Sequence, residues 1–209
     1  MEKTERWCIH LIRHGETEGT VNKLYYGSSD LPLTPEGVDA LRKLVETGIY
    51  PKGENAVMYT SGLLRTEQTF ALIYGDREHH VLEEFQELDF GEFEMKSHHM
   101  LLPDQRYVAW MEDQTRKMPP PGGESFQTFE DRIEAGFEKL KGGHKERKEK
   151  SGEAGHKENV VVVCHGGVIA TLMIKLFQEE KHFYQWLPET GHGYTITMEG
   201  ERGLGYQIF

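Results

Sequence analysis

Hydrophobic residues along this chain alternate between short continuous runs and longer stretches with helical spacing. Apolar runs at 8–12, 56–60 and 160–164 are short and contain β-branched residues, as strands do. The last run, four valines followed by Cys164, has no polar position, which indicates a strand covered on both faces. Helical spacing follows these runs, most clearly at 168–177. This alternation of strands and helices predicts an α/β fold with a largely parallel sheet.

Cap residues mark where the predicted helices begin and end. Thr34 is a suitable N-cap, Pro35 takes the first helical position, and Gly48 and Pro51 close the pattern. The apolar residues between these limits recur every three or four positions: Val38, Leu41, Leu44 and Val45. We expect Ser61 to cap the next helix, because it follows the second apolar run directly.

The remaining segments complete a single domain over residues 1–209. Runs at 194–198 and 206–209 flank a glycine-containing turn and predict a hairpin at a sheet edge. The stretch 92–120 is expected to form a variable lid. Residues 141–158 contain almost no apolar side chain and several glycines, so we expect a flexible hydrophilic connector there.

Composition and charge narrow the range of functions. A chain of 209 residues with 37% hydrophobic positions suits one globular domain. Its formal net charge of −11 argues against a nucleic-acid-binding surface, so an anionic ligand would require a local basic pocket. Cys8 and Cys164 lie in or beside apolar runs and are expected to be buried thiols. The first apolar run is too short for a signal-peptide core or a membrane span, so we expect a cytoplasmic protein without a membrane segment.

Three predicted strand ends carry cationic or titratable side chains. Arg13 and His14 follow the first run, Arg65 follows the second, and His165 follows the valine run. Because the carboxyl ends of parallel strands meet at one edge of a sheet, these residues can surround one ligand. Arginine forks and the free N–H groups at helix starts favour a tetrahedral anion. The sequence therefore predicts a phosphate-sized pocket at this edge.

Five sequence blocks strengthen this interpretation. They occur in this order: Arg13-His14-Gly15-Glu16-Thr17, Ser61-Gly62-Leu63-Leu64-Arg65-Thr66-Glu67-Gln68-Thr69, Glu87-Leu88-Asp89-Phe90-Gly91, Pro121-Gly122-Gly123-Glu124-Ser125 and Cys164-His165-Gly166-Gly167. With these blocks the chain resembles the histidine phosphatase superfamily over nearly its whole length. That group includes cofactor-dependent phosphoglycerate mutases and many small phosphatases. The resemblance implies a three-layer α/β/α sandwich with a mostly parallel central sheet.

The resemblance assigns roles to the residues at the strand ends. His14 would be the nucleophile, which accepts the phosphoryl group on a ring nitrogen. Arg13, Arg65 and His165 would hold the non-bridging oxygens, whose charge must be matched as the P–O bond breaks. We expect that this chemistry needs neither a metal ion nor a cofactor.

A further acid must give a proton to the leaving alkoxide. The family pattern assigns this role to Glu87, and Glu84 in the same acidic stretch is the alternative. The same pattern places Gly27 and Gly166 at the substrate.

The chain departs from the family pattern at two places. Many relatives have an asparagine six residues after the nucleophile, where this chain has Thr20, with Asn22 nearby. Either side chain, or neither, would bind the phosphate. Many relatives also have Trp-Glu-Gly after the glycine that follows the acid, where this chain has Phe93-Glu94-Met95. The local substrate wall is therefore expected to differ.

The other histidines and the lid segment have structural explanations. Adjacent histidines such as His79-His80 and His98-His99 rarely point at one ion, so we expect surface or core histidines and no metal site. His10, inside the first run, is expected to be packed in the core. The large side chains near the lid fit either a small satellite core or a substrate-binding lid: Phe93, Met95, Tyr107, Trp110, Met111 and Met118.

The sequence favours a phosphomonoester hydrolase that acts on a small phosphorylated metabolite through a phosphohistidine, as a monomer or homodimer. A phosphoglycerate mutase is one alternative, although such mutases carry a larger insertion than the stretch between Glu87 and His165. A non-catalytic module that binds phosphorylated ligands is another. Phosphosugars, nucleotides, phosphoserine and ribazole phosphate all stay open as substrates, because specificity is expected to lie in 92–120.

Overall fold

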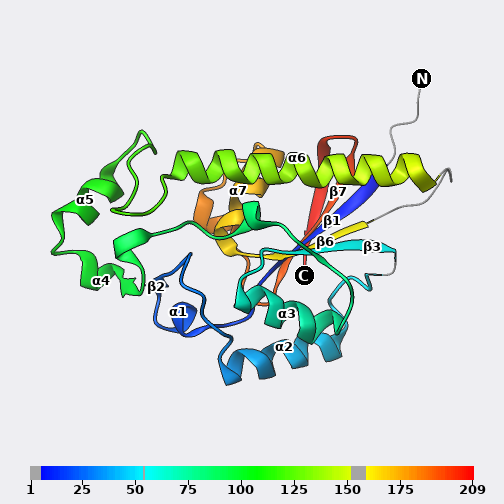
Figure 1. The fold of residues 1–209 in the computed structure, drawn as a ribbon, viewed down its shortest axis with the longest axis horizontal. Coiled ribbons are helices and arrows are strands. Elements are labelled where there is room, and N and C mark those ends of the chain that lie inside the picture. Colours follow the sequence, from blue (N-terminus) through cyan, green and yellow to red (C-terminus); the bar gives the residue numbers. More distant parts are fainter. Residues whose placement is uncertain (1–5, 54, 152–158) are drawn as a thin grey trace.

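The computed structural model describes residues 6–53, 55–151 and 159–209 (Figure 1). Its main sheet has the strand order β4-β3-β6-β1-β7-β8. The strands of this sheet are β1 (Arg6–Arg13), β3 (Ala56–Thr60), β4 (His80–Val81), β6 (Asn159–Cys164), β7 (Gly193–Glu199) and β8 (Arg202–Ile208). The first four in this list run parallel to one another, whereas β7 is antiparallel to β1 and β8 is antiparallel to β7. This architecture confirms the predicted α/β fold with a mostly parallel central sheet.

The register between β1 and β6 brings two of the predicted site residues together. Ile9 pairs with Val160 and Arg13 pairs with Cys164 in a parallel ladder. The N–H of His14 then donates to the carbonyl of Cys164 over 3.0 Å, immediately before His165. The two strands therefore end at the same level, and each delivers a histidine to the same edge of the sheet.

Helices cover both faces of the sheet. The helices α2 and α3 lie on one face, and α6 and α7 lie on the other (Figure 1). Their bounds are α2 (Pro35–Thr47), α3 (Leu64–Tyr74), α6 (Phe126–Ser151) and α7 (Gly166–Leu176). The valines of β6 are fully buried between these layers. A strand that is covered on both faces gains stability from apolar side chains on both, which explains the unbroken valine run.

The caps of the first predicted helix are confirmed, and the cap of the second is corrected. Thr34 accepts a hydrogen bond from the N–H of Gly37, and Gly48 ends α2 in the left-handed conformation with φ 71°. In contrast, α3 begins at Leu64 with Leu63 as its N-cap, and no side chain caps it. Ser61 lies too far before the first turn, and its hydroxyl contacts His165, the residue that follows β6.

The structure confirms the predicted C-terminal hairpin but differs from the prediction for the hydrophilic segment. Strands β7 and β8 form the predicted hairpin, and β8 is a sheet edge. The segment expected to be a flexible connector instead continues helix α6 as far as Ser151. Charged residues with good helix propensity dominate 144–151, so the helix can extend there without an apolar face. The rest of that segment, 152–158, lies outside the described residues.

Short helices, strands and 3-10 turns make up the rest of the fold. They comprise α1 (Glu18–Val21), β2 (Leu24–Tyr25), β5 (Lys96–Ser97), α4 (His98–Leu101), α5 (Gln105–Glu112) and three 3-10 turns, η1 (Glu83–Phe85), η2 (Gly91–Phe93) and η3 (Phe183–Trp186). Strands β2 and β5 pair as a small separate sheet. Helices α4 and α5 lie beyond one end of the main sheet (Figure 1).

Some of the large side chains near the expected lid are buried in a core and others are exposed, so both explanations offered from the sequence, a satellite core and a lid, hold in part. Phe93, Tyr107 and Trp110 are buried and belong to the main core cluster. Met95, Met111 and Met118 are exposed. The segment is therefore anchored by aromatic packing on one side and presents flexible apolar side chains on the other.

His10 packs inside β1, as expected, and should make stability depend on pH. Burial lowers its pKa from 6.5 to about 4, and its Nδ1 lies 2.9 Å from the Thr195 hydroxyl. Below pH 6.5 the unfolded chain binds this proton and the folded chain does not, so stability falls as the pH drops toward 4. We expect this group to account for at most about 3 kcal/mol of unfolding free energy over that range.

Denaturant unfolding of wild type and His10→Gln across this pH range measures the effect. The glutamine keeps a polar contact with Thr195 but does not titrate, so the variant should show a shallower loss of stability on acidification. Equal slopes for the two proteins would contradict the assignment.

Candidate active site

His14 follows β1 and is nearly buried, with 3% of its surface exposed. The backbone N–H of Gly15 donates to the Thr69 hydroxyl over 2.9 Å, which fixes the turn after the strand. Nδ1 of His14 lies 2.7 Å from the Gly15 carbonyl. Because a carbonyl can only accept, Nδ1 carries the proton and Nε2 keeps a free lone pair. Burial, and then the charges of Arg65 and Arg13, hold the pKa of His14 well below its usual value. The ring is therefore neutral and nucleophilic at neutral pH.

Arg65 is fully buried in the first turn of α3. Its Nη2 donates to the Gly27 carbonyl over 2.8 Å and its Nη1 to the Ser29 carbonyl over 2.9 Å. The guanidinium also lies over the Tyr26 ring, 5.0 Å from its centroid. Burial lowers the pKa of Arg65, but a guanidinium stays charged at any ordinary pH. Its remaining N–H groups provide fixed positive charge at the strand ends.

Gly27 is required by the close approach of two chain segments. A Cβ at this position would lie 1.6 Å from the carbonyl oxygen of Leu88. The glycine lets its segment pass directly beside the loop that carries Glu87, while its carbonyl holds Arg65. The structure thus gives Gly27 a structural role beside Arg65, and its place at the substrate stays a prediction.

His165 lies between Arg65 and Ser61 and is fully buried. Its Nδ1 accepts from Nε of Arg65 over 3.3 Å, so Nε2 carries the proton and donates to the Ser61 hydroxyl at 2.7 Å. The rings of His14 and His165 have centroids 5.3 Å apart. Burial, and next the charge of Arg65, hold the pKa of His165 well below its usual value. A second neutral imidazole therefore stands beside the first.

Arg13 reaches the site from the last position of β1. Its Nη1 donates to the Pro188 carbonyl over 2.8 Å, whereas its buried Nε has no acceptor among the described residues. The guanidinium packs against Gly166, the first residue of α7, where a Cβ would lie 3.3 Å from Nε. An unpaired buried N–H beside a helix N-terminus favours the oxygen of an anion.

Glu87 lies in the loop between η1 and η2, and its carboxyl contacts the first turn of α7. Its Oε2 accepts from the N–H of Gly167 over 2.9 Å, and its Oε1 accepts from the N–H of Leu88 over 3.0 Å. Glu87 lines the same cavity of about 570 Å³ as Arg13 and His14. The predicted acid and the predicted nucleophile therefore face one space.

The cavity extends away from these polar groups along an aromatic wall. Its apolar lining includes Tyr25, Phe90, Trp110, Phe126, Phe183 and Tyr184. Trp110 stacks on Phe126 with ring centroids 5.5 Å apart and an interplanar angle of 13°. Tyr184 is 76% exposed and marks the outer side of this wall. A ligand held at His14 would project its other end against flat apolar surfaces.

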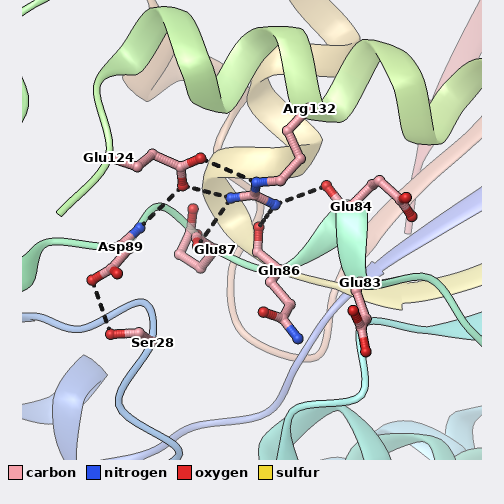
Figure 2. Close-up of a pocket in the computed structure, with 8 residues that line it drawn as sticks. All are labelled: Ser28, Glu83, Glu84, Gln86, Glu87, Asp89, Glu124 and Arg132. Atoms are coloured by element: carbon pink, nitrogen blue, oxygen red, sulfur yellow. Dashed lines mark hydrogen bonds and ion pairs between the residues drawn. The ribbon is translucent and has the colours of Figure 1, made fainter.

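Six candidates from the sequence are not among the residues that line this cavity: Arg65, His165 and Gly27, described above, and Thr20, Asn22 and Glu84. The Thr20 hydroxyl donates to the Thr17 carbonyl within a capping box of α1, and Asn22 is the exposed C-cap of that helix. Neither residue lines the cavity, and their contact with phosphate stays a prediction. Glu84 faces a neighbouring acidic hollow (Figure 2). Its hydrogen bond from Lys139 lowers its pKa, so it is a poorer proton donor than the sequence suggested.

Several contributors were missed by sequence reasoning. Ser61 contacts His165, Thr69 holds the turn after His14, and the Tyr26 ring meets His14 edge-on at 6.3 Å. Ser61 and Thr69 both lie in the block around Arg65, so polar residues at its ends were the available signal. Tyr26 precedes Gly27 directly but carried no such signal.

Neither a metal-binding cluster nor a membrane-spanning helix occurs within the described residues. Among the described residues, no group of three or more His, Cys, Asp or Glu is placed to hold a metal ion. Within the same part of the chain, no helix is both long and apolar enough to cross a membrane.

Comparisons with known proteins agree with this geometry. A model of the histidine phosphatase superfamily (branch 1) matches residues 9–203. The chain is 32% identical over 172 residues to the adenosylcobalamin/alpha-ribazole phosphatase of Escherichia coli (strain K12), covering 80% of this chain and 78% of that protein. It is 29% identical over 186 residues to the 2,3-bisphosphoglycerate-dependent phosphoglycerate mutase of Parvibaculum lavamentivorans, covering 79% and 78%. The crystal structure of the alpha-ribazole phosphatase from Shigella flexneri matches with a TM-score of 0.76 and 28% identity, covering 94% and 93% of the two chains.

Proposed function

This chain belongs to branch 1 of the histidine phosphatase superfamily, and from this premise we propose that it hydrolyses a small phosphomonoester through a phosphohistidine at His14. The observation that carries the proposal is the buried, neutral His14, whose Nδ1 is fixed by the Gly15 carbonyl while Nε2 stays free. Arg13 and Arg65 provide the charge that binds the phosphate beside it.

In the first step, Nε2 of His14 attacks phosphorus and the bond to the leaving oxygen breaks. The leaving alkoxide takes a proton from Glu87, and the phosphoryl group stays on the histidine. Each carboxyl oxygen of Glu87 accepts one backbone N–H, which leaves a second lone pair on each to carry the proton. The backbone contacts orient the acid without blocking it.

In the second step, water attacks the same phosphorus and the P–N bond breaks. The Glu87 carboxylate takes the proton from the water, which restores the acid for the next cycle. His14 returns to its neutral form and inorganic phosphate leaves.

The side chains around the phosphate compensate the negative charge on its non-bridging oxygens. The unpaired Nε of Arg13 and the free N–H groups of Arg65 can hold non-bridging oxygens, and binding of the anion lets His165 exchange its present partners for an oxygen. Because two fixed guanidinium groups match the charge of the transferring group, we propose that no metal ion takes part. The free thiols Cys8 and Cys164 support the proposal of a reducing, cytoplasmic setting.

The cavity favours hydrolysis over mutase activity. A mutase must hold a small, highly charged acid that carries a second phosphate, whereas most described side chains that line the cavity beyond His14 are aromatic or aliphatic, with Arg116 as the one cation among them besides Arg13. The non-catalytic alternative is disfavoured because the nucleophile His14, the cation Arg13 and the acid Glu87 line one cavity. The named activity of the E. coli relative and the aromatic wall together support alpha-ribazole phosphate, which carries a planar base, as the first candidate substrate.

A panel of phosphomonoesters tests this proposal. We expect kcat/KM for alpha-ribazole phosphate to exceed that for glycerol phosphate and phosphoserine by about 10-fold or more, because burial of an aromatic base adds apolar contact. Release of inorganic phosphate is the measurement, with interconversion of 3- and 2-phosphoglycerate assayed in parallel. Interconversion without phosphate release would establish the mutase instead, and equal kcat/KM values across the panel would contradict the aromatic preference.

The Tyr184→Ala variant locates the preference in the cavity. It should raise KM for the aromatic substrate by about 2- to 10-fold, the range of one aromatic contact, and leave KM for glycerol phosphate unchanged. Val81→Ala is the matched control, since Val81 is another exposed apolar residue that does not line the cavity. If Tyr184→Ala behaves like this control, Tyr184 does not contribute to the preference for an aromatic substrate, and that part of the proposal is wrong.

A further inference from the structure

The loop that carries Glu87 is not held by the backbone hydrogen bonds of a strand or helix. Glu87 lies between the 3-10 turns η1 and η2, outside every strand and helix. An acid that must meet a leaving oxygen has to be placed within a fraction of an ångström of its working position. The required constraint must therefore come from another element.

Arg132 on helix α6 supplies five contacts to this region. Its Nη1 donates to the carbonyls of Glu84 and Gln86 over 2.8 and 3.0 Å, and its Nη2 lies 3.4 Å from the Glu87 carbonyl. The other side of the guanidinium forms a two-pronged ion pair with Glu124, 3.1 Å from Nε to Oε1 and 2.6 Å from Nη2 to Oε2. A guanidinium has five N–H groups, and here each of them has an acceptor.

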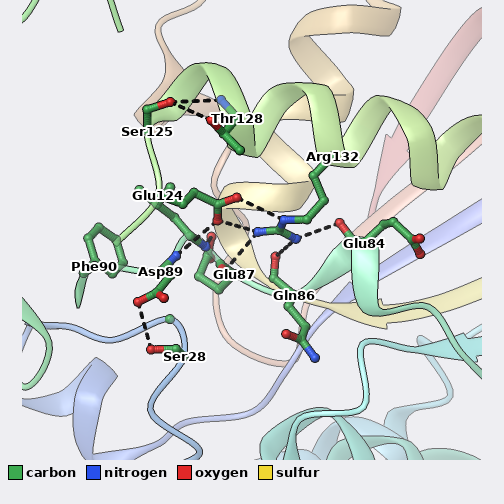
Figure 3. Close-up of polar contacts among 12 residues, drawn as sticks. Ser28, Glu84, Gln86, Glu87, Asp89, Phe90, Glu124, Ser125, Thr128 and Arg132 are labelled. Carbon is green, nitrogen blue, oxygen red and sulfur yellow. Dashed lines mark hydrogen bonds and ion pairs between the residues drawn. The ribbon is translucent and has the colours of Figure 1, made fainter. Parts of the chain in front are cut away.

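Glu124 extends the same network to the other side of Glu87. Its Oε2 accepts from the N–H of Asp89 at 3.3 Å, and its own backbone N–H donates to the Asp89 carbonyl over 3.0 Å. Figure 3 shows the result, in which the backbone before Glu87 is held by Arg132 and the backbone after it by Glu124. We call the Arg132–Glu124 pair the clamp.

The contacts of Arg132 fix the position of the backbone around Glu87 and do not neutralise the charge of the Glu87 carboxyl. Three carbonyls converge on one planar fork whose side chain is three-quarters buried, and only arginine presents donors in that arrangement. The guanidinium contacts the main chain of Glu87, while the carboxyl of Glu87 points away toward Gly167. Arg132 therefore leaves the acid free to exchange its proton.

We propose that Arg132, held by Glu124, is a positioning residue that fixes Glu87 against the N-terminus of α7 so that its carboxyl meets the leaving oxygen. This inference rests on the proposed function, in which Glu87 is the proton donor. Loss of the clamp should weaken protonation of the leaving group and leave attack by His14 intact.

First-turnover release of the leaving group measures this step. Arg132→Met should slow an alkyl phosphate by about 10-fold or more, while p-nitrophenyl phosphate, whose leaving group scarcely needs a proton, changes by about 2-fold or less. Arg132→Lys keeps the charge but not the fork, so its alkyl rate should lie between those of Arg132→Met and wild type. Lys139→Met is the matched control: Lys139 also lies on α6, and its ion pair within the described part of the chain is with the side chain of Glu84, so both rates should stay at wild type.

Two further variants keep the test decisive. Glu124→Gln weakens the clamp with little change in shape, and it decides the matter if Arg132→Met does not fold. In a Glu87→Gln background, Arg132→Met should not change the ratio of alkyl to aryl rates further, because a residue that acts through Glu87 has no effect once the acid is gone.

The outcomes separate the two proposals. If Glu87→Gln itself slows first-turnover release from alkyl and aryl phosphates equally, the acid assignment fails and the clamp proposal fails with it. If Glu87→Gln discriminates between them but Arg132→Met and Glu124→Gln slow both substrates alike, or neither, the clamp is only structural and the proposed function stands.

Discussion

Replacing His14 by alanine should lower kcat by about 10⁴-fold or more, because the variant has no nitrogen to receive the phosphoryl group. The neighbouring Arg13 and Arg65 do not depend on His14 for their hydrogen bonds. The variant should therefore still bind inorganic phosphate. Loss of turnover with binding retained separates the role of the nucleophile from that of the anion pocket.

Trapping of the phosphoenzyme provides the direct measurement for His14. A phosphohistidine survives alkali and is lost in acid, so wild type quenched during turnover should carry a label with that behaviour, and His14→Ala should carry none. His10→Gln is the matched control, because His10 is another buried histidine, lies on the strand that His14 follows, and does not line the cavity. A label that persists in His14→Ala would assign the nucleophile elsewhere. Wild type that binds phosphate but hydrolyses no aryl phosphate would support the binding-module alternative.

Replacing Glu87 by glutamine should produce a large effect that depends on the leaving group. The amide cannot give a proton, so the first-turnover release of an alkyl alcohol should fall by about 10²- to 10⁴-fold. Release of p-nitrophenolate in the first turnover should change little. Because Glu87 also takes the proton from the attacking water, the phosphoenzyme should then accumulate and the steady-state rate should fall for both substrates.

A burst experiment with p-nitrophenyl phosphate distinguishes these steps. We expect Glu87→Gln to give a full burst followed by a slow steady state. Glu84→Gln is the matched control, since Glu84 lies in the same acidic stretch but is held by Lys139 outside the cavity. If Glu84→Gln shows the loss and Glu87→Gln does not, the acid role belongs to Glu84.

The sequence predicted the elements whose signal is local. The apolar runs located β1, β3 and β6, and Thr34 located the start of α2. Local signals failed in two cases. Ser61 resembles an N-cap by type and place, yet α3 begins beyond it, and charged residues resembling a connector continue α6. In both cases the local sequence is compatible with more than one backbone structure, and contacts with the rest of the fold select between them.

The order of strands in the sheet and the partners across it were beyond sequence reasoning. Ser61 and His165 are 104 positions apart, and Arg132 is 45 positions from the carbonyl of Glu87. No periodicity or helix cap predicts such pairs. Ser61 meets His165 because β3 and β6 pair side by side, and Arg132 meets the carbonyl of Glu87 because α6 packs against η1. The aromatic wall has the same origin, because it draws side chains from both ends of the chain.

By itself, the sequence determined the chemical groups and the strand ends on which they stand, because backbone geometry and burial of apolar side chains depend on near neighbours. Only the tertiary structure decided how those groups act. The free nitrogen of His14, the orphaned N–H of Arg13 and the clamp around Glu87 each arise from burial and hydrogen bonding between distant segments. These interactions set protonation and direction, which residue identity alone leaves open.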